Sequence, residues 1–291
     1  MAVSPFDLDQ PVQSQSARKA RNRFAELVAL DDDQINLAEA TLLIATEEYS
    51  RLNIQDYLDK LDRFGDLARE RAEGASDASH VISAINSTLF DELGFHGNRD
   101  GYFDPRNSFL NQVIDRRTGI PITLTVVYLE VARRIGFQIR GVGLPYHFIA
   151  KRENEAGDIF IDPFNGGRLL DTGGCAEMLS EMTSGKEELQ PEHLESVGNK
   201  RILARILLNL LGIYQAGDPR RALATIEHLL LINPNYAPHV RLRGALLASV
   251  GDQTGAIAEL ERYLMLVPDA EDFDAIKEQI QSIHLNRARL N

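Results

Sequence analysis

Cysteine is almost absent from this sequence, since Cys175 is the only one in 291 residues. A single thiol excludes a disulfide within the chain and is typical of a protein of the reducing cytoplasm. Long apolar runs are absent too, because ILLNLLGIY and ALLASV are far too short to span a bilayer. The N-terminal stretch MAVSPFDLDQPVQSQSARKA lacks the apolar core of a signal peptide. We therefore expect a soluble, cytoplasmic protein with no membrane partner.

Positive charge is scarce relative to negative charge, with 31 Lys and Arg against 43 Asp and Glu and a net charge of −12. This balance disfavours nucleic acid and anionic membranes as partners. The seven histidines are scattered without H-x-x-x-H or cysteine-based spacing, so we expect no metal site. The phosphate-binding P-loop and GxGxxG motifs are missing, so we expect no nucleotide or redox cofactor.

The N-terminal third of the chain is predicted to be helical. Residues 1–16 are polar, contain two prolines and are expected to form a disordered arm. From residue 17 to residue 93, apolar side chains recur at three- and four-residue intervals, which predicts helices. The predicted helices are FAELVAL, INLAEATLLIATEEY, IQDYLDKLDRFGDLARERA and HVISAINSTLFDELG, with Gly94 as the stop of the last.

The sequence pattern of residues 94–190 predicts a mixed α+β core. The turn-rich segment FHGNRDGYFDPRNS predicts a structured loop. Helices are expected in SFLNQVIDRRTG and over residues 122–135, followed by strands in FQIRGVGLP, HFIAKR and IFIDPF. The link ENEAGD predicts a hairpin between the last two strands. The fold class is therefore α+β, with a helical N-terminal region before this core.

Residues 191–291 contain an internal repeat. Five residues recur 34 positions later in the pairs Gly217/Gly251, Asp218/Asp252, Ala222/Ala256, Leu230/Leu264 and Pro234/Pro268. A small residue where two helices cross and a proline after the second helix, at this period, resemble the tetratricopeptide repeat. We expect all-α repeats here, closed by a last helix in AEDFDAIKEQIQSI.

The segments GIPITLTVVYLEVARRIG, PYHFIAK and IFIDPFNGG resemble a bacterial family of transglutaminase-like proteins with C-terminal tetratricopeptide repeats. The family is historically named after a regulator of invasion-gene expression, and the resemblance covers roughly residues 20–270. It implies a papain-like α+β core with a nucleophile at the start of a buried helix. His147 would be the base, and Asp162 would orient it. Members of the family generally lack the catalytic cysteine, as this chain does.

Two residues are candidates for the missing nucleophile. Counting back from Gly136 by the spacing usual in active members places it near Pro121–Thr123, where Thr123 carries the nearest hydroxyl. The alternative interpretation is that Thr123 packs, or bonds to a backbone carbonyl in the first helical turn. Cys175 follows two glycines at the expected start of a helix, where a thiol pKa can fall. Its alternative is a buried structural cysteine.

The loops around this pair are predicted to line a groove. The candidate binding residues are Asn98, Tyr102, Asn107, Ser108, Arg116, Pro121 and Asn165. Irregular loops on a rigid core often carry binding sites. The simpler interpretations are an N-cap for Asn107 and Ser108, an ion pair or solvated turn for Arg116, and a helix start for Pro121.

Two functions of different classes remain. The first, which we favour, is a non-catalytic regulatory module that binds another protein or a peptide through the degenerate core and the repeats. The second is an acyl-transfer or amide-hydrolysing enzyme that uses His147 and Asp162 with an atypical nucleophile. The two are distinguished by whether a hydroxyl or thiol faces His147.

Overall fold

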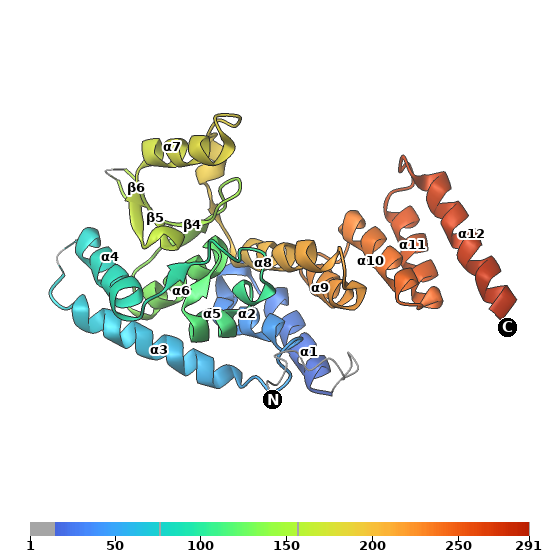
Figure 1. Cartoon of the computed structure of the whole chain (residues 1–291), viewed down its shortest axis with the longest axis horizontal. Coiled ribbons are helices and arrows are strands. Elements are labelled where there is room, and N and C mark those ends of the chain that lie inside the picture. The colour runs from blue at the N-terminus through green and yellow to red at the C-terminus, as the bar shows by residue number, and fades with distance from the viewer. Residues whose placement is uncertain (1–14, 76, 156, 291) are drawn as a thin grey trace. The chain divides into compact units, whose positions relative to one another are not determined.

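A computed structural model describes residues 15–75, 77–155 and 157–290 of the chain (Figure 1). Of the arm expected over residues 1–16, residues 1–14 lie outside the described ranges. The described residues fall into two compact units, residues 15–206 and residues 207–290, with the boundary inside one helix. Each unit is described separately. The predicted α+β class, with helices before the core and helical repeats after it, is confirmed.

The first unit begins with helices, as predicted. They are α1 (Gln15–Ala29), η1 (Asp32–Gln34, a 3-10 turn), α2 (Leu37–Ala45), α3 (Ile54–Arg71) and α4 (Ala78–Asn86). The side chains of Asn36, Asn53 and Asp77 each accept a main-chain N–H at the start of α2, α3 and α4. Such caps satisfy N–H groups that the helix itself leaves unbonded. The chain continues from α4 as a π-helix, η2 (Ser87–Glu92), which the sequence pattern did not predict.

The core of this unit is an antiparallel sheet in the order β6-β5-β4-β3-β7. Its strands are β3 (Arg140–Val142), β4 (Ile149–Arg152), β5 (Ile159–Asp162), β6 (Arg168–Leu170) and β7 (Ser196–Val197). A separate parallel pair joins β1 (His96–Gly97) to β2 (Thr118–Gly119). The short turns are η3 (Pro105–Asn107), η4 (Pro163–Asn165) and η5 (Pro191–Leu194). The three predicted strands and the hairpin are therefore confirmed.

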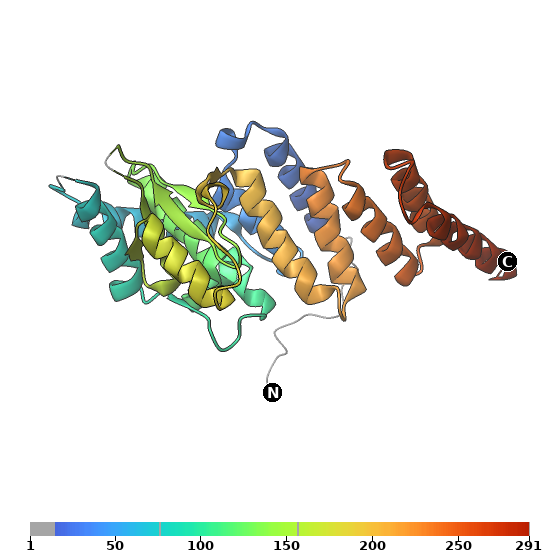
Figure 2. The same ribbon diagram turned by 90° about the horizontal axis from the view of Figure 1, so that it is seen from above.

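Two helices cover the sheet on opposite faces (Figures 1 and 2). Helix α7 (Thr172–Thr183) lies on one face, and α6 (Pro121–Arg134) lies on the other, next to α3 and α5 (Leu110–Arg116). Nearly every residue of α6 is buried, which its apolar sequence TLTVVYLEVA requires. As predicted, α6 starts at Pro121, whose fixed φ and missing N–H suit a first helical position.

The second unit is all helical, as the repeat predicted. Its helices are the end of α8 (Asn199–Tyr214), then α9 (Pro219–Ile232), α10 (Ala237–Ser249), α11 (Gln253–Leu266) and α12 (Phe273–Leu290). The repeated aspartates have the same role in both repeats, since Asp218 caps the N-terminus of α9 and Asp252 caps that of α11. The repeated alanines, Ala222 and Ala256, are both fully buried.

Gly244 marks a close helix crossing in this unit, and its replacement tests the crossing. A Cβ at Gly244 of α10 would lie 2.9 Å from Cγ of Leu260 in α11, whereas a Cβ at Gly212 of α8 meets nothing within 4 Å. Gly244→Ala is expected to lower the free energy of unfolding by about 1–3 kcal/mol through overpacking.

Gly212→Ala is the matched control, because it removes backbone freedom in a helix without a clash. It is expected to raise the free energy of unfolding by about 0.5–1 kcal/mol. Urea unfolding of the full chain measures both changes. Equal effects of the two substitutions would show that α10 and α11 are not in tight contact at Gly244.

Candidate functional site

The structure brings His147 and Asp162 together at one end of the hairpin of β4 and β5. Nε2 of His147 lies 3.0 Å from Oδ1 of Asp162, and the two residues are 4% and 0% exposed. The ring N–H does not point along the line to the carboxylate, so Nε2 is buried without a well-aligned hydrogen bond. His147 and Asp162 are therefore in close, buried polar contact, without a well-aligned hydrogen bond between them. The catalytic roles given to both residues stay predictions.

Asp162 is held by the turn that follows it. Its carboxylate accepts the main-chain N–H groups of Phe164 (3.1 Å) and Asn165 (3.3 Å) and the side-chain amide of Asn165 (2.6 Å). Burial opposes ionisation of this carboxyl, but the contacts with His147 and Asn165 outweigh it and hold the pKa of Asp162 below its usual value. Asp162 is thus a buried carboxylate that His147 and the turn together keep charged.

Phe164 and Arg99 cover this pair from the side of the loop. The Phe164 ring packs edge-to-face on the His147 ring, with centroids 5.9 Å apart. The Arg99 guanidinium lies 5.6 Å from the centroid of Phe164 and donates to the side-chain oxygen of Asn165. A Cβ at Gly97 would lie 2.6 Å from the Phe164 ring, so this glycine lets the ring approach the main chain. Arg99 was not among the predicted site residues.

Asn86 supports the same turn from behind, and sequence reasoning missed it. Its side-chain N–H₂ donates to the main-chain oxygen of Gly167 (2.9 Å), and its oxygen accepts from the Tyr128 hydroxyl (3.0 Å). Gly167 in turn donates its N–H to the main-chain oxygen of Asp162 (2.9 Å). Asn86 is the last residue of α4 before the π-helix, and π-helical turns often occur at functional sites. That turn type is visible only in three dimensions.

Thr123 lies in the first turn of α6 and is fully buried. Its Oγ1 lies 2.7 Å from the main-chain oxygen of Asn107 and 3.2 Å from that of Ile120, and it accepts the Ile120 N–H (3.2 Å). A hydroxyl has only one hydrogen to donate, and in Thr123 that hydrogen is already directed at main-chain carbonyl oxygens. Thr123 thus ties the start of α6 to the preceding loop.

The prediction that the Cys175 thiol pKa falls at a helix start is wrong. Cys175 is in the first turns of α7, as expected, but it is 0% exposed inside a cluster with Val142, Ile149 and Phe160. Burial there, followed by the negative charges of Asp171 and Asp162, raises the pKa of Cys175 to about 12. Desolvation of the thiolate outweighs any benefit from the helix N-terminus.

Cys175 is therefore expected to be inert in the native protein. Iodoacetamide at pH 8 should leave the native chain unmodified and should modify it fully in concentrated urea, because the thiolate is the reactive form. Intact-mass spectrometry measures the modified fraction. Rapid alkylation of the native chain would show that Cys175 is open to solvent and would restore it as a candidate nucleophile.

The interpretation of Asn107 and Ser108 as an N-cap pair is wrong, because Phe109 precedes α5 without a side-chain cap. Asn107 is instead a buried hub. Its amide N–H₂ donates to the main-chain oxygens of Gly101 (2.7 Å) and Tyr102 (3.3 Å). The Asn107 side chain thus bonds to the preceding loop instead of capping the helix that follows it.

Other predicted binding residues complete this loop. The oxygen of Asn107 accepts from Asn98 (3.1 Å) and from Arg116 (3.3 Å). Arg116 also lies 4.0 Å from Asp104, in agreement with the ion-pair interpretation. Ser108 is buried, and its hydroxyl has no hydrogen-bond partner in the described ranges. The structure thus joins Asn98, Asn107 and Arg116 in one network. Their role in binding stays a prediction.

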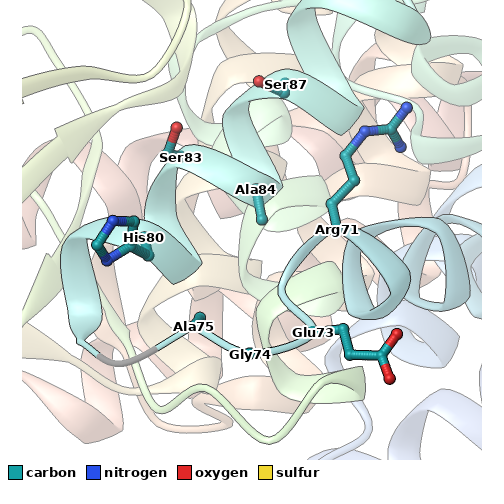
Figure 3. A pocket seen from close by; sticks show the side chains of 8 residues that line it. All are labelled: Arg71, Glu73, Gly74, Ala75, His80, Ser83, Ala84 and Ser87. Carbon is teal, nitrogen blue, oxygen red and sulfur yellow. The ribbon is translucent and has the colours of Figure 1, made fainter.

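One cavity of about 560 Å³ lies away from the pair, between the end of α3 and α4 (Figure 3). Its polar lining includes Arg71, Glu73 and His80, and it contains none of the predicted site residues. Arg71 is already paired with Glu92. In the part of the chain that the structure describes, no group of three or more His, Cys, Asp or Glu is placed to hold a metal ion. Nor is any described helix long and apolar enough to cross a membrane.

Comparison with known proteins gives one family match in each of the two structural units, with a boundary close to theirs. A family model described as "Transglutaminase-like superfamily" matches residues 55–208, and one described as "Tetratricopeptide repeat" matches residues 211–281. A UPF0162 protein of Xylella fastidiosa is 35% identical over 265 residues, which cover 90% of this chain and 94% of that protein.

Two other matches cover a smaller part of the chain or are weaker. F-box only protein 21 of Homo sapiens is 35% identical over 144 residues, which cover 46% of this chain and 22% of that protein. The crystal structure of menin aligns with 89% of this chain and 72% of its own, at 10% identity and a TM-score of 0.38. A likeness this weak does not bear on fold or function.

Proposed function

This chain belongs to the transglutaminase-like superfamily, as its sequence predicted, and we propose that it is a non-catalytic protein-binding module of the cytoplasm. The state of the two candidate nucleophiles carries the proposal. The only thiol, Cys175, is fully buried in the core with a raised pKa. The hydroxyl at the expected position, Thr123, is engaged by main-chain carbonyls. In the described part of the chain, neither candidate nucleophile is therefore available to the pair of His147 and Asp162, and acyl transfer in this fold needs one.

The tetratricopeptide repeats support binding as the function. Repeats of this type typically mediate protein–protein interactions through extended helical surfaces. A core that keeps a buried polar pair and an ordered loop, while both of its described candidate nucleophiles are buried and engaged elsewhere, suits a surface for a partner better than a reaction centre. We therefore propose a regulatory module that binds another protein or a peptide.

Partner capture with the full chain tests the proposal. The immobilised chain is incubated with a lysate of the producing cells, and the captured protein is then purified and titrated by calorimetry. Saturable binding in a fixed ratio is the expected result. A matched bait with His147→Ala shows whether the core contributes to the affinity. The proposed binding function would be contradicted if no captured protein bound the chain again after purification.

The alternative function is amide hydrolysis or acyl transfer with an activated water as the nucleophile. The depressed pKa of Asp162 favours it, because a charged carboxylate beside a buried histidine is the arrangement that activates a base. Release of ammonia from glutamine-containing proteins, as water attacks the side-chain amide and leaves a carboxylate, would support this function if His147→Ala abolished it. We expect no release above that of the His147→Ala variant.

A further inference from the structure

Arg205, in α8, holds the turn that carries His147. Its Nη2 donates to the main-chain oxygens of Leu144 (3.0 Å) and His147 (2.8 Å), and its guanidinium lies 5.4 Å from the centroid of the Phe148 ring. Tyr146 in this turn has a φ of 60°, in the left-handed region that residues other than glycine rarely adopt. Such a conformation needs support from its surroundings. Arg205 supplies it and lies beside the main chain of the candidate base.

The positive charge of Arg205 has no carboxylate partner among the residues that the structure describes. Other poorly exposed arginines do have one, as Arg134 has Glu130. Arg117 also lacks a carboxylate, but its guanidinium lies within 4.8 Å of the centroids of two phenylalanine rings. Only Nη2 of Arg205 bonds to the described chain, which leaves N–H groups of Nε and Nη1 for a ligand.

An exposed aromatic pair lies in the loop before η3. Phe103 is 79% exposed and Tyr102 is 38% exposed, with their ring centroids 5.5 Å apart. The buried Asn107 bonds to this loop and fixes it. Contacts join this loop to the turn that Arg205 holds, because Arg99 of the loop packs on the Phe164 ring and Phe164 packs on the His147 ring. Arg205 itself bonds to the main-chain oxygen of His147. In agreement with this placement, the charge of Arg205 opposes the rise that burial causes in the pKa of Tyr102. An ordered loop that holds large aromatic side chains in solvent is typical of a recognition surface.

We propose that Arg205, Tyr102 and Phe103 bind a peptide segment of the partner protein through one Asp or Glu side chain of that segment. This inference rests on the proposed binding function and names the chemistry of the partner. The carboxylate would accept charge-assisted hydrogen bonds from Arg205, whose planar fork matches a carboxylate. The aromatic pair would contact apolar residues on either side of the carboxylate.

The charge of the whole chain limits how acidic the segment can be. A net charge of −12 repels a polyanion, so neither nucleic acid nor a run of acidic residues suits the surface. One carboxylate among apolar neighbours does suit it, because the attraction is local. Asp104, in the same loop as Tyr102, is ion-paired with Arg106 and forms no ion pair with Arg205.

Selection from a phage-displayed library of random short peptides, with the full chain as bait, tests the inference. Selected peptides should share one Asp or Glu flanked by apolar residues. Synthesis with both ends blocked separates a side-chain carboxylate from a chain terminus. Changing the selected Glu to Gln should then weaken binding about tenfold or more, which corresponds to about 1.4 kcal/mol. Fluorescence anisotropy measures both affinities.

Variants assign the effect to these residues. In Arg205→Gln the difference between Glu and Gln peptides should fall below about twofold. In Arg201→Gln, an exposed arginine one turn earlier in α8, it should persist. Phe103→Ser, at a side chain too exposed to affect folding, should weaken both peptides equally.

The inference is overturned if no acidic residue is selected, if blocked peptides lose binding, or if the Glu preference survives in Arg205→Gln. If the captured partner still binds the full chain in those cases, only the inference fails. If that partner does not bind either, the proposed function fails with it.

Discussion

Asp162→Ala is expected to lower the free energy of unfolding of the transglutaminase-like unit by about 3–5 kcal/mol. The carboxylate is fully buried and accepts three hydrogen bonds from Phe164 and Asn165 while it contacts His147. Alanine would leave those buried donors unbonded and would remove the carboxylate beside His147, and each unsatisfied buried group costs about 1–3 kcal/mol. Urea unfolding of the full chain, followed by circular dichroism, measures the loss.

Asp162→Asn is the matched control, because an amide oxygen can still accept the turn's N–H groups. It should lose clearly less stability than alanine at neutral pH. The pKa of Asp162 is depressed in the folded chain, so the carboxylate's contribution is complete above its unfolded pKa of about 4. It is lost as the pH falls through the lower, folded value. The stability gap between the natural chain and Asp162→Asn should therefore shrink below about pH 4, and a constant gap would contradict a charged Asp162.

Gly167→Ala is expected to cost about 3 kcal/mol. Gly167 has a φ of 76°, and a Cβ there would lie 2.2 Å from Oδ1 of Asn86. An alanine must therefore both adopt a left-handed backbone and displace Asn86 from its bonds with Tyr128 and with the main chain of Gly167. The substitution should also loosen the turn that holds Asp162.

Gly166→Ala separates the two causes. Gly166 has a similar φ of 69°, but a Cβ there would meet nothing within 4 Å. It should cost only the left-handed conformation, about 1–2 kcal/mol. The difference between the two variants is the contribution of the Asn86 contact. If both variants lose the same stability, Asn86 does not brace the turn as described.

Local sequence signals were enough to predict the helix and the strands that carry the candidate site. Pro121 set the start of α6, because its missing N–H is tolerated only at a helix start. The hairpin between β4 and β5 placed His147 and Asp162 together, because their spacing suits two antiparallel strands. The repeated Asp218 and Asp252 mark the starts of two helices of the second unit, α9 and α11.

The features that the sequence did not predict depend on contacts between distant residues. Asn107 has the local pattern of an N-cap, but its partners lie in the loop before it and in α5. Cys175 has the local pattern of an activated thiol, but burial under the sheet decides its pKa. Asn86 bonds to Gly167, 81 positions away, and no motif joins the two. Tertiary packing fixes each of these, and a single sequence does not carry that information.

In the proposed function, the chain combines the transglutaminase-like scaffold with a centre that has lost its nucleophile. The pair of His147 and Asp162 keeps its geometry and its supporting shell of Asn86, Asn165 and Phe164. Buried polar networks of this kind fix one conformation of the surrounding loops. In this chain, the proposed role of that rigidity is to present a surface to a partner.

The most direct test of a centre without a nucleophile is the intact mass of the full chain after incubation with an activated acyl ester, such as a p-nitrophenyl ester. An active transglutaminase-like site would form an acyl-enzyme that His147→Ala prevents. We predict that the natural chain and His147→Ala give the same spectrum, with no acyl adduct at Thr123 or Cys175. An adduct at either residue that depends on His147 would contradict the account.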